Sequence, residues 1–384
     1  MTEKSTSQRN PTPVPQVTTE RSKRIEMLRT IAILGVVVLH VPPLETDVAV
    51  RHSYSSEFLF QIKYLLSAAI FMASVPTLSV ISGYLLFSTY NESRYLQTVI
   101  KKARTLVIPL ILWNLPLLAI LYAARIEGWP VYRDAGDLAS LWDAVNLTVG
   151  ITAPPLNFPL HFLLDIFICI VLSPVFSFFI RRAPFLGLAI CVAILFADRE
   201  NAVLVRGDIF ASYYLGGLVA YKRWTLEAID RYWWAFGGVF LALCIGYTAV
   251  EAAHGYAGGA FHDYGRQVLR IAGPFAFWGV SAYLAGVSWS DGVARFARYS
   301  FFIFCAHAPI LKLLWMVYRA AGGTVESPLY WLFYGAAAPA TVLLSVALLR
   351  LLMRVAPFVL DMLAVPPAPR YGAPGGERSV KEAG

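Results

Sequence analysis

Charged residues are scarce in this sequence. Asp, Glu, Lys and Arg make up 15% of its 384 residues, and hydrophobic residues make up 58%. Soluble domains carry about a quarter charged residues. No polar stretch is long enough to form a separate soluble domain, whereas apolar segments of membrane-spanning length recur along the chain. The composition excludes a soluble enzyme and predicts an all-α, polytopic membrane protein.

The sequence also lacks the patterns of metal and nucleotide sites. Its four cysteines all fall within apolar segments, without metal-ligand spacing and outside the polar loops where a disulfide would form. It contains no zinc spacing, P-loop or dinucleotide fingerprint. We therefore expect no metal and no permanently bound cofactor. The net charge of +8 fits cytoplasmic loops of a membrane protein, so we expect no nucleic-acid partner.

The apolar segments predict about ten transmembrane helices. Lys and Arg residues near their ends concentrate on the side of the N-terminus, so both termini are expected in the cytoplasm. The polar residues 1–20 and the Pro/Gly-rich residues 364–384 are expected to be disordered, which leaves residues 21–363 as one transmembrane domain. The predicted helices cover residues 25–43, 60–87, 104–124, 159–180, 184–198, 208–222, 232–251, 268–287, 299–318 and 329–354.

The first apolar helix carries polar groups at both ends, in the stretch RTIAILGVVVLH. Arg29 and His40 are eleven residues apart, which in an α-helix is three turns plus about 20°, so both side chains lie on one face about 16 Å apart. Glu26, three residues before Arg29, extends the same stripe. Ionisable groups are costly in lipid, so this stripe is expected to face the bundle interior or a wet cavity.

Other polar side chains interrupt the apolar helices. Lys101 and Arg104 lie at the cytoplasmic end of the third helix, and His307 lies inside the ninth. His161 and Asp165 are four residues apart on the fourth helix, as are Arg266 and Arg270 on the eighth. Each ionisable residue named so far also has a purely structural interpretation. In that interpretation Arg29 and Glu26 lie at the membrane interface, and His40 lies at the outer end of the first helix near two prolines. Together they indicate a functional interior.

Several motifs resemble those of the acyltransferase family 3 membrane proteins, which acylate cell-surface glycans. The stretch RIEMLRTIAILGVVVLH is similar to the family's first helix, with its basic residue, ten residues and then a histidine. SGYLLF, KKARTLVIP, PLHFLLDIFICIVLSP and SFFIFCAHAPIL resemble later family elements in the same order. Phe162 follows His161 directly, where the family usually has a Leu-Trp pair.

The resemblance implies a multi-pass protein of the bacterial inner membrane. Such a protein would move an acyl group, acetyl in most members and succinyl in others, from cytoplasmic acyl-CoA to a hydroxyl of an extracytoplasmic glycan or lipid-linked sugar. Many members carry a fused esterase-like domain. This chain resembles the stand-alone form, so the bundle would complete the transfer itself or hand the group to a partner in the glycan assembly machinery.

This activity suggests roles for the polar residues. Arg29, Lys101 and Arg104 would pair with the phosphates of the donor, acetyl-CoA or another acyl-CoA, and Glu26 would hold Arg29 in place. His40 would act as the general base on the acceptor hydroxyl or would accept the acyl group transiently.

The acceptor side is expected to be formed by the remaining polar residues. These substrate-binding candidates are His161, Asp165, Arg266, Arg270 and His307. The alternative function is a proton-coupled transporter or an exporter, since buried His, Asp and Arg also occur in carriers. No repeated halves and no matched pair of Gly/Pro-interrupted helices are visible to support it.

Overall fold

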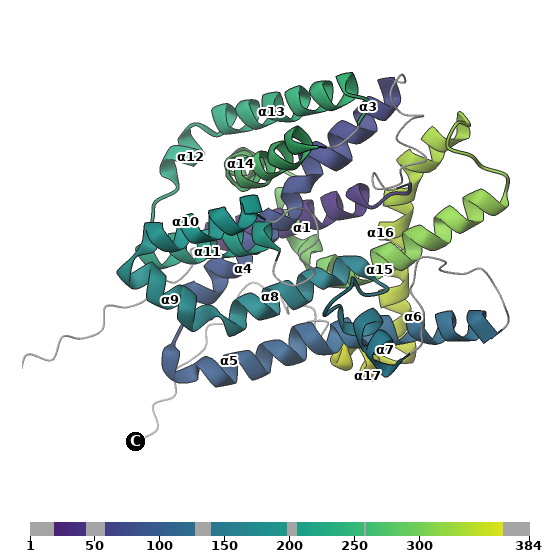
Figure 1. Cartoon of the computed structure of the whole chain (residues 1–384), viewed down its shortest axis with the longest axis horizontal. Helices are drawn as coiled ribbons and strands as arrows, with labels where there is room; N and C mark the ends of the chain where they lie inside the picture. The colour runs from purple at the N-terminus through teal and green to yellow at the C-terminus, as the bar shows by residue number, and fades with distance from the viewer. Residues whose placement is uncertain (1–18, 44–57, 127–139, 198–205, 257–258, 364–384) are drawn as a thin grey trace, which may run out of the picture.

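The computed structural model describes residues 19–43, 58–126, 140–197, 206–256 and 259–363, which contain helices and no strands (Figure 1). The predicted all-α class is confirmed. The expected disordered segments fall almost entirely on residues 1–18 and 364–384, which lie outside the described part.

The helices are α1 (Thr19–Leu39), α3 (Phe58–Tyr64), α4 (Ser74–Ser88), α5 (Tyr95–Lys102), α6 (Ile108–Ile126), α7 (Leu141–Val149), α8 (His161–Val171), α9 (Ser173–Arg182), α10 (Pro184–Ala197), α11 (Gly207–Lys222), α12 (Glu227–Arg231), α13 (Trp233–Ala253), α14 (Ala260–Ala285), α15 (Ser290–Ala320), α16 (Leu329–Val355) and α17 (Pro357–Met362).

Short π and 3₁₀ turns join some of these helices into longer ones. The π-helical turn η1 (Leu65–Ile70) and the 3₁₀ turn η2 (Phe71–Ala73) connect α3 to α4. The π-helical turn η4 (Ala103–Val107) connects α5 to α6, so one bent helix runs along the lower edge in Figure 1. The 3₁₀ turn η3 (Glu92–Arg94) precedes α5, and η5 (Phe158–Leu160) precedes α8.

Each of the ten predicted ranges coincides with helix, but not every helix could cross a membrane by its length and composition. In the described residues six helical segments meet that criterion, or seven when α8 and α9, bent by 56°, count as one span. The other three are α1, which carries several charges in its first half, and α10 and α11, which are 14 and 16 residues long. The ten-span count and the cytoplasmic termini stay predictions.

Helix α1 runs through the middle of the bundle (Figure 1). It packs against α4, α14, α15 and α16. Ala32, Ile33, Val36 and Val37 of α1 lie in the largest apolar core, together with side chains of α6, α8 and α15. Helix α1 is therefore a central helix, because neighbouring helices cover it on nearly every side.

The closest helix pair is α4 with α11. A Cβ atom on Gly83 would collide with the carbonyl oxygen of Tyr213, and one on Gly216 would collide with the carbonyl oxygen of Val80. Small residues at such positions let two membrane helices approach backbone to backbone. The glycine of the SGYLLF motif is therefore a packing residue.

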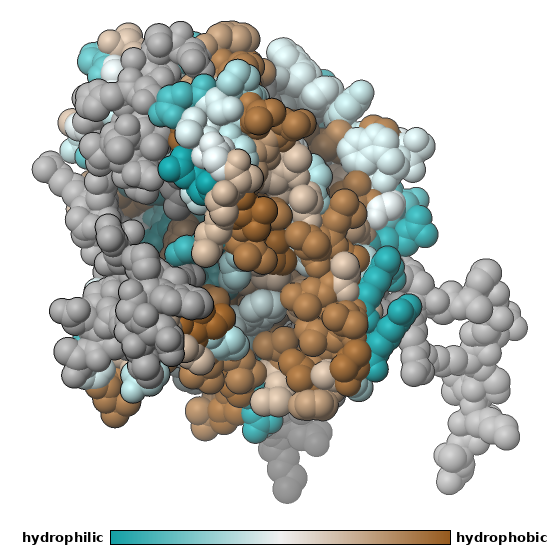
Figure 2. Space-filling model, turned by 90° about the vertical axis from the view of Figure 1, so that its right-hand side faces the viewer, coloured by the Kyte–Doolittle hydropathy of each residue, from teal (hydrophilic) through white to brown (hydrophobic). Residues whose placement is uncertain are grey.

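The outer surface is apolar where a bilayer would contact it. Figure 2 shows hydrophobic residues over much of the face formed by α6, α15 and α16. Leu332 and Leu343 of α16 are each 70% exposed, and Val317 of α15 is 61% exposed. Such an area on one face is typical of a surface that contacts lipid rather than water.

The α4–α11 contact predicts a strong effect of one added methyl group. Gly216→Ala should destabilise the protein by about 1–3 kcal/mol, because the methyl group has no room beside the Val80 carbonyl. Thermal unfolding in detergent measures this effect. Gly238→Ala, where no atom lies within 4 Å of the added Cβ, is the matched control. Equal melting temperatures for the two variants would contradict the close approach.

Candidate active site

Two histidines meet at the C-terminal end of α1. The Nε2 atom of His307, from α15, lies 3.2 Å from the Nδ1 atom of His40. The ring centroids are 5.1 Å apart, and Phe158 packs edge-on against His40 with centroids 4.9 Å apart. His307 is fully buried, whereas His40 is partly accessible. The structure therefore places the predicted base beside a second, better protected imidazole.

Backbone carbonyls fix the protonation of this pair. The Nδ1 atom of His307 lies 2.6 Å from the Phe304 carbonyl, and that of His40 lies 2.8 Å from the Val36 carbonyl. A carbonyl oxygen only accepts, so each Nδ1 carries the proton and each neutral ring has its lone pair on Nε2. The His307 lone pair then faces the His40 Nδ1–H. The Nε2 lone pair of His40 has no hydrogen-bond partner among the described residues, and this nitrogen is the basic atom of the pair.

A proline in α15 helps to place His307. Pro309 has no N–H, so the carbonyl of Cys305, four residues earlier, loses its helical partner. The side-chain amide of Asn157 donates to this carbonyl at 2.8 Å. The backbone N–H of Asn157 in turn donates to the side chain of Asn114 on α6, at 2.7 Å. These contacts tie α15, α6 and the segment before α8 together next to the histidine pair.

The other end of the α1 stripe is cationic and accessible. After Ser22, Arg29 is the only exposed residue of α1, while the helix around it is buried or partly buried. Its charge acts on Glu26, one turn earlier, and on Lys102 at the end of α5. Lys101 and Arg104 flank Lys102 and are exposed. Lys102, which the sequence did not single out, is the basic residue of this segment whose charge interacts with that of Arg29, and Lys101 and Arg104 are its neighbours in the chain.

The stripe is closed between its two ends. Ile33 and Val36 occupy the turns between Arg29 and His40 on the same face, and they are 6% and 1% exposed. Both belong to the largest apolar core. The expected seam is therefore polar at its ends and sealed by packed hydrocarbon in its middle, because the helices around α1 meet there.

His161 and Asp165 form a separate buried pair. The Nδ1 atom of His161 lies 3.2 Å from the Asp165 carboxylate, and its Nε2–H donates to the Gly150 carbonyl at 3.1 Å. Gly150 has φ = 85°, and a Cβ there would lie 2.9 Å from the His161 ring. Both nitrogens of His161 are thus engaged, so this histidine holds the end of α7 against α8 and has no nitrogen left for a substrate.

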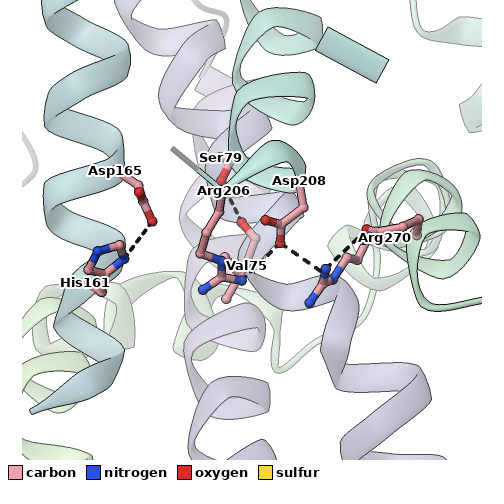
Figure 3. A network of polar contacts seen from close by, with 8 residues as sticks. Val75, Ser79, His161, Asp165, Arg206, Asp208 and Arg270 are labelled. Carbon is pink, nitrogen blue, oxygen red and sulfur yellow. Dashed lines mark hydrogen bonds and ion pairs between the residues drawn. The ribbon is translucent and has the colours of Figure 1, made fainter. Parts of the chain in front are cut away.

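Arg270 belongs to a charge network with Arg206 and Asp208, two residues that were not among the predicted site residues (Figure 3). The Asp208 carboxylate accepts from Arg206 at 3.1 Å and lies 3.6 Å from Arg270 Nε. Arg270 also donates to Gln267 at 3.2 Å. Asp208 is buried at the start of α11, and the charge of Arg206 acts on His40. The sequence signal for this network was the triplet Arg206-Gly207-Asp208 at the start of the predicted helix 208–222.

Arg266 belongs to a different cluster from Arg270. Its Nη1 donates to His262 Nε2 at 3.2 Å, and His262 Nδ1 lies 3.0 Å from the buried Glu251 carboxylate. Tyr247 lies 3.0 Å from the same Nδ1. The i, i+4 spacing placed Arg266 and Arg270 one turn apart, but Arg266 contacts His262 whereas Arg270 lies beside Asp208. In the described residues no group of three or more His, Cys, Asp or Glu side chains could hold a metal ion.

The Asp208 network predicts a large loss of stability when its charge is removed. Asp208→Asn leaves two arginines around a buried neutral amide, which should cost about 3–5 kcal/mol. Asp291→Asn is the matched control, because Asp291 is 69% exposed in its ion pair with Lys23. Thermal unfolding in detergent should separate the two variants clearly. A small and equal effect of both would show that Asp208 does not hold the arginines together.

Comparison with known proteins agrees with the motifs. The family model described as an acyltransferase domain matches residues 22–350. The succinoglycan biosynthesis protein ExoH of Rhizobium meliloti (strain 1021) is 29% identical over 357 residues, which cover 92% of this chain and 93% of that protein. No solved structure matches this chain. Since the family model covers most of the sequence, from the start of α1 to the last turns of α16, the chain belongs to the acyltransferase family 3 membrane proteins.

Proposed function

We propose that this protein transfers an acyl group from cytoplasmic acyl-CoA to a hydroxyl of an extracytoplasmic glycan or glycolipid. The observation that supports this most directly is the arrangement of α1, which has an accessible arginine in its middle and an oriented histidine pair at its C-terminal end. The relative's name refers to the biosynthesis of a glycan, which favours a glycan acceptor. The proposed location is the bacterial inner membrane, and the proposed acyl group is acetyl, with succinyl as the alternative.

The donor would bind at the cationic end of α1. Arg29, Lys102, Lys101 and Arg104 present positive charges that suit the phosphates of coenzyme A. Arg29 can bind phosphate through two parallel hydrogen bonds, whereas the lysines act as point charges. Glu26 lies one turn away and its charge acts on Arg29, which restricts the guanidinium without covering it. The pantetheine arm would then extend along α1 toward His40.

The transfer itself needs one base and one proton donor. His40 Nε2 takes the proton of the acceptor hydroxyl as its oxygen attacks the thioester carbonyl carbon. The carbon–sulfur bond breaks, and the coenzyme A thiolate leaves with the proton that His40 gives back. His307 does not touch the substrate; it holds the His40 Nδ1–H, which keeps the basic lone pair on Nε2. Neither step needs a bound cofactor beyond the donor.

The histidine pair gives an ordered series of variants. His40→Gln should lower transfer by about 10²-fold or more, since it removes the base. His307→Gln keeps an amide oxygen that accepts from His40 Nδ1–H, so it should retain more activity than His307→Leu. Purified protein in lipid vesicles, supplied with acyl-CoA and glycan, measures the product by mass spectrometry, which also identifies the acyl group.

The same preparation tests the alternative of transport. Uptake of the unmodified glycan or a small solute, without any acyl product, would overturn the acyltransferase proposal. Full activity of His40→Gln in correctly folded protein would remove His40 from the reaction. Equal activities of His307→Gln and His307→Leu would remove the positioning role of His307 while leaving the overall reaction in place.

The sealed middle of the stripe predicts a blocking variant. The pantetheine arm must pass Ile33 and Val36, so this apolar layer has to open during the reaction. Ile33→Trp should abolish transfer and leave coenzyme A binding unchanged, whereas Arg29→Ala should weaken that binding. Calorimetric binding and turnover measure both effects. Leu343→Trp, on the exposed face of α16, is the control. Normal turnover by folded Ile33→Trp would exclude this route.

A further inference from the structure

An apolar cavity lies on another side of α1, away from the histidine pair. It encloses about 70 Å³, is partly open, and is lined almost entirely by hydrocarbon. Its walls come from the first half of α1, the second halves of α4 and α11, the start of α12 and the middle of α14. The lining includes Leu28, Ile81, Val219, Leu226, Ile229 and Phe275. No residue proposed above to bind the donor or to act on the acceptor lines it.

The cavity follows from two packing features already present in the sequence. Glycines draw α11 against α4, so α11 cannot pack equally closely on α14. Pro274 lies inside α14, removes one helical hydrogen bond there and lines the cavity itself. The close α4–α11 contact and Pro274 therefore account for the space between α11, α12 and α14.

Water does not suit this cavity. A buried water needs two to four polar partners, and the lining offers almost none. Two lining residues, Leu226 before α12 and Ile229 within it, are partly exposed. Tyr221 and Trp224, 43% and 39% exposed, lie at the end of α11, and exposed aromatic residues of this kind mark the membrane–water interface. The apolar material available at that level is the acyl chain of a lipid.

Basic residues stand next in the sequence to the lining residues of α11 and α12. Lys222 and Arg223 lie between Val219 and Leu226 in sequence, and Arg231 lies two residues after Ile229; all three are exposed. Among the described residues Lys222 and Arg223 have no ion-pair partner. The acidic residues nearby are Glu227, which is exposed, and Asp230, which is paired with Arg24 at 2.7 Å. The balance favours an anionic head group, since basic residues near the bilayer surface attract anionic lipids.

The backbone at Arg223 is an independent indication of function. Arg223 has φ = 54°, and its place after α11 is the left-handed position that glycine usually fills. An arginine there costs conformational energy relative to glycine. Keeping a guanidinium at this position is useful when it has a ligand to bind, and Arg223 stands between the lining residues Val219 and Leu226 in the sequence.

We propose that the cavity between α11, α12 and α14 binds one acyl chain of an anionic membrane phospholipid, whose phosphate contacts Lys222 and Arg223. The occupant is a bulk phospholipid of the leaflet that contacts this end of the bundle. It is not the lipid tail of a glycan acceptor, because the cavity lies at the end of α1 that is opposite His40. The bound acyl chain would fill the space between α11 and α14 and so stabilise the packing of these helices.

Native mass spectrometry of protein purified in mild detergent tests this site, with phosphatidylglycerol and phosphatidylcholine as the added probes. The expected result is one retained lipid with a preference for phosphatidylglycerol. Val219→Trp should fill the cavity and abolish retention. Arg223→Gly should weaken retention about fivefold, the effect of one basic residue near the bilayer surface. Because glycine suits a positive φ, this variant should fold at least as well as the original protein.

Leu343→Trp, on the exposed face of α16, is the control and should retain the lipid. The proposal is overturned if no lipid is retained, if phosphatidylcholine binds equally well, or if Arg223→Gly binds phosphatidylglycerol as tightly as the original protein. Retention of a lipid-linked sugar in place of a phospholipid would also overturn it. The readout does not depend on acyl transfer, so its failure leaves the proposed reaction untouched.

Discussion

The contact between the His40 and His307 rings depends on how two helices cross in the centre of the bundle. His40 directly follows the last residue of α1, and α15 brings His307 to the same point, two residues before its proline. The Thr30 hydroxyl in the middle of α1 also donates to the Val293 carbonyl near the start of α15 at 3.1 Å, so the same two helices are joined at a second place. Any movement of α15 along α1 would separate the imidazoles and release the orientation of the basic nitrogen.

Polar groups in this bundle are mostly satisfied in pairs, each on its own helix junction. His161, paired with Asp165 on α8, donates to the Gly150 carbonyl after α7. Asp208 with its arginines fixes α11 to α14, and Glu251 with His262 fixes α13 to α14. Such pairing is expected where water is scarce, because an unpaired buried charge is costly. His40 Nε2 and Arg29 differ from this pattern. The packing leaves both available, Arg29 in the middle of α1 and His40 directly after its last residue.

The sequence predicted the helices well because long apolar runs have few alternatives in a membrane protein. It also predicted that Arg29 and His40 share a face, since helical geometry alone decides that. The pairing of His307 with His40 could not be predicted, because 267 residues separate them and the spacing rules act within one helix. For the same reason Arg206 and Asp208 were missed, and Arg266 and Arg270 were grouped although one contacts His262 and the other lies beside Asp208.

The middle of the stripe shows a further limit of reasoning from one helix. Periodicity placed Ile33 and Val36 between the two polar ends, but it did not say whether space or packed side chains would lie opposite them. Only the arrangement of α6, α8 and α15 around α1 decides this, and it closes the layer.

The π-helical turn η4 determines how the basic side chains of α5 are oriented relative to Arg29. A π turn contains one residue more than the α turn it replaces, so the helix before it is rotated by about 100° relative to a continuous α-helix. Lys101 and Lys102 precede this turn, and the orientation of Lys102 toward Arg29 therefore depends on that extra residue. A chain without Leu106 would keep every basic side chain and still orient Lys102 differently relative to Arg29.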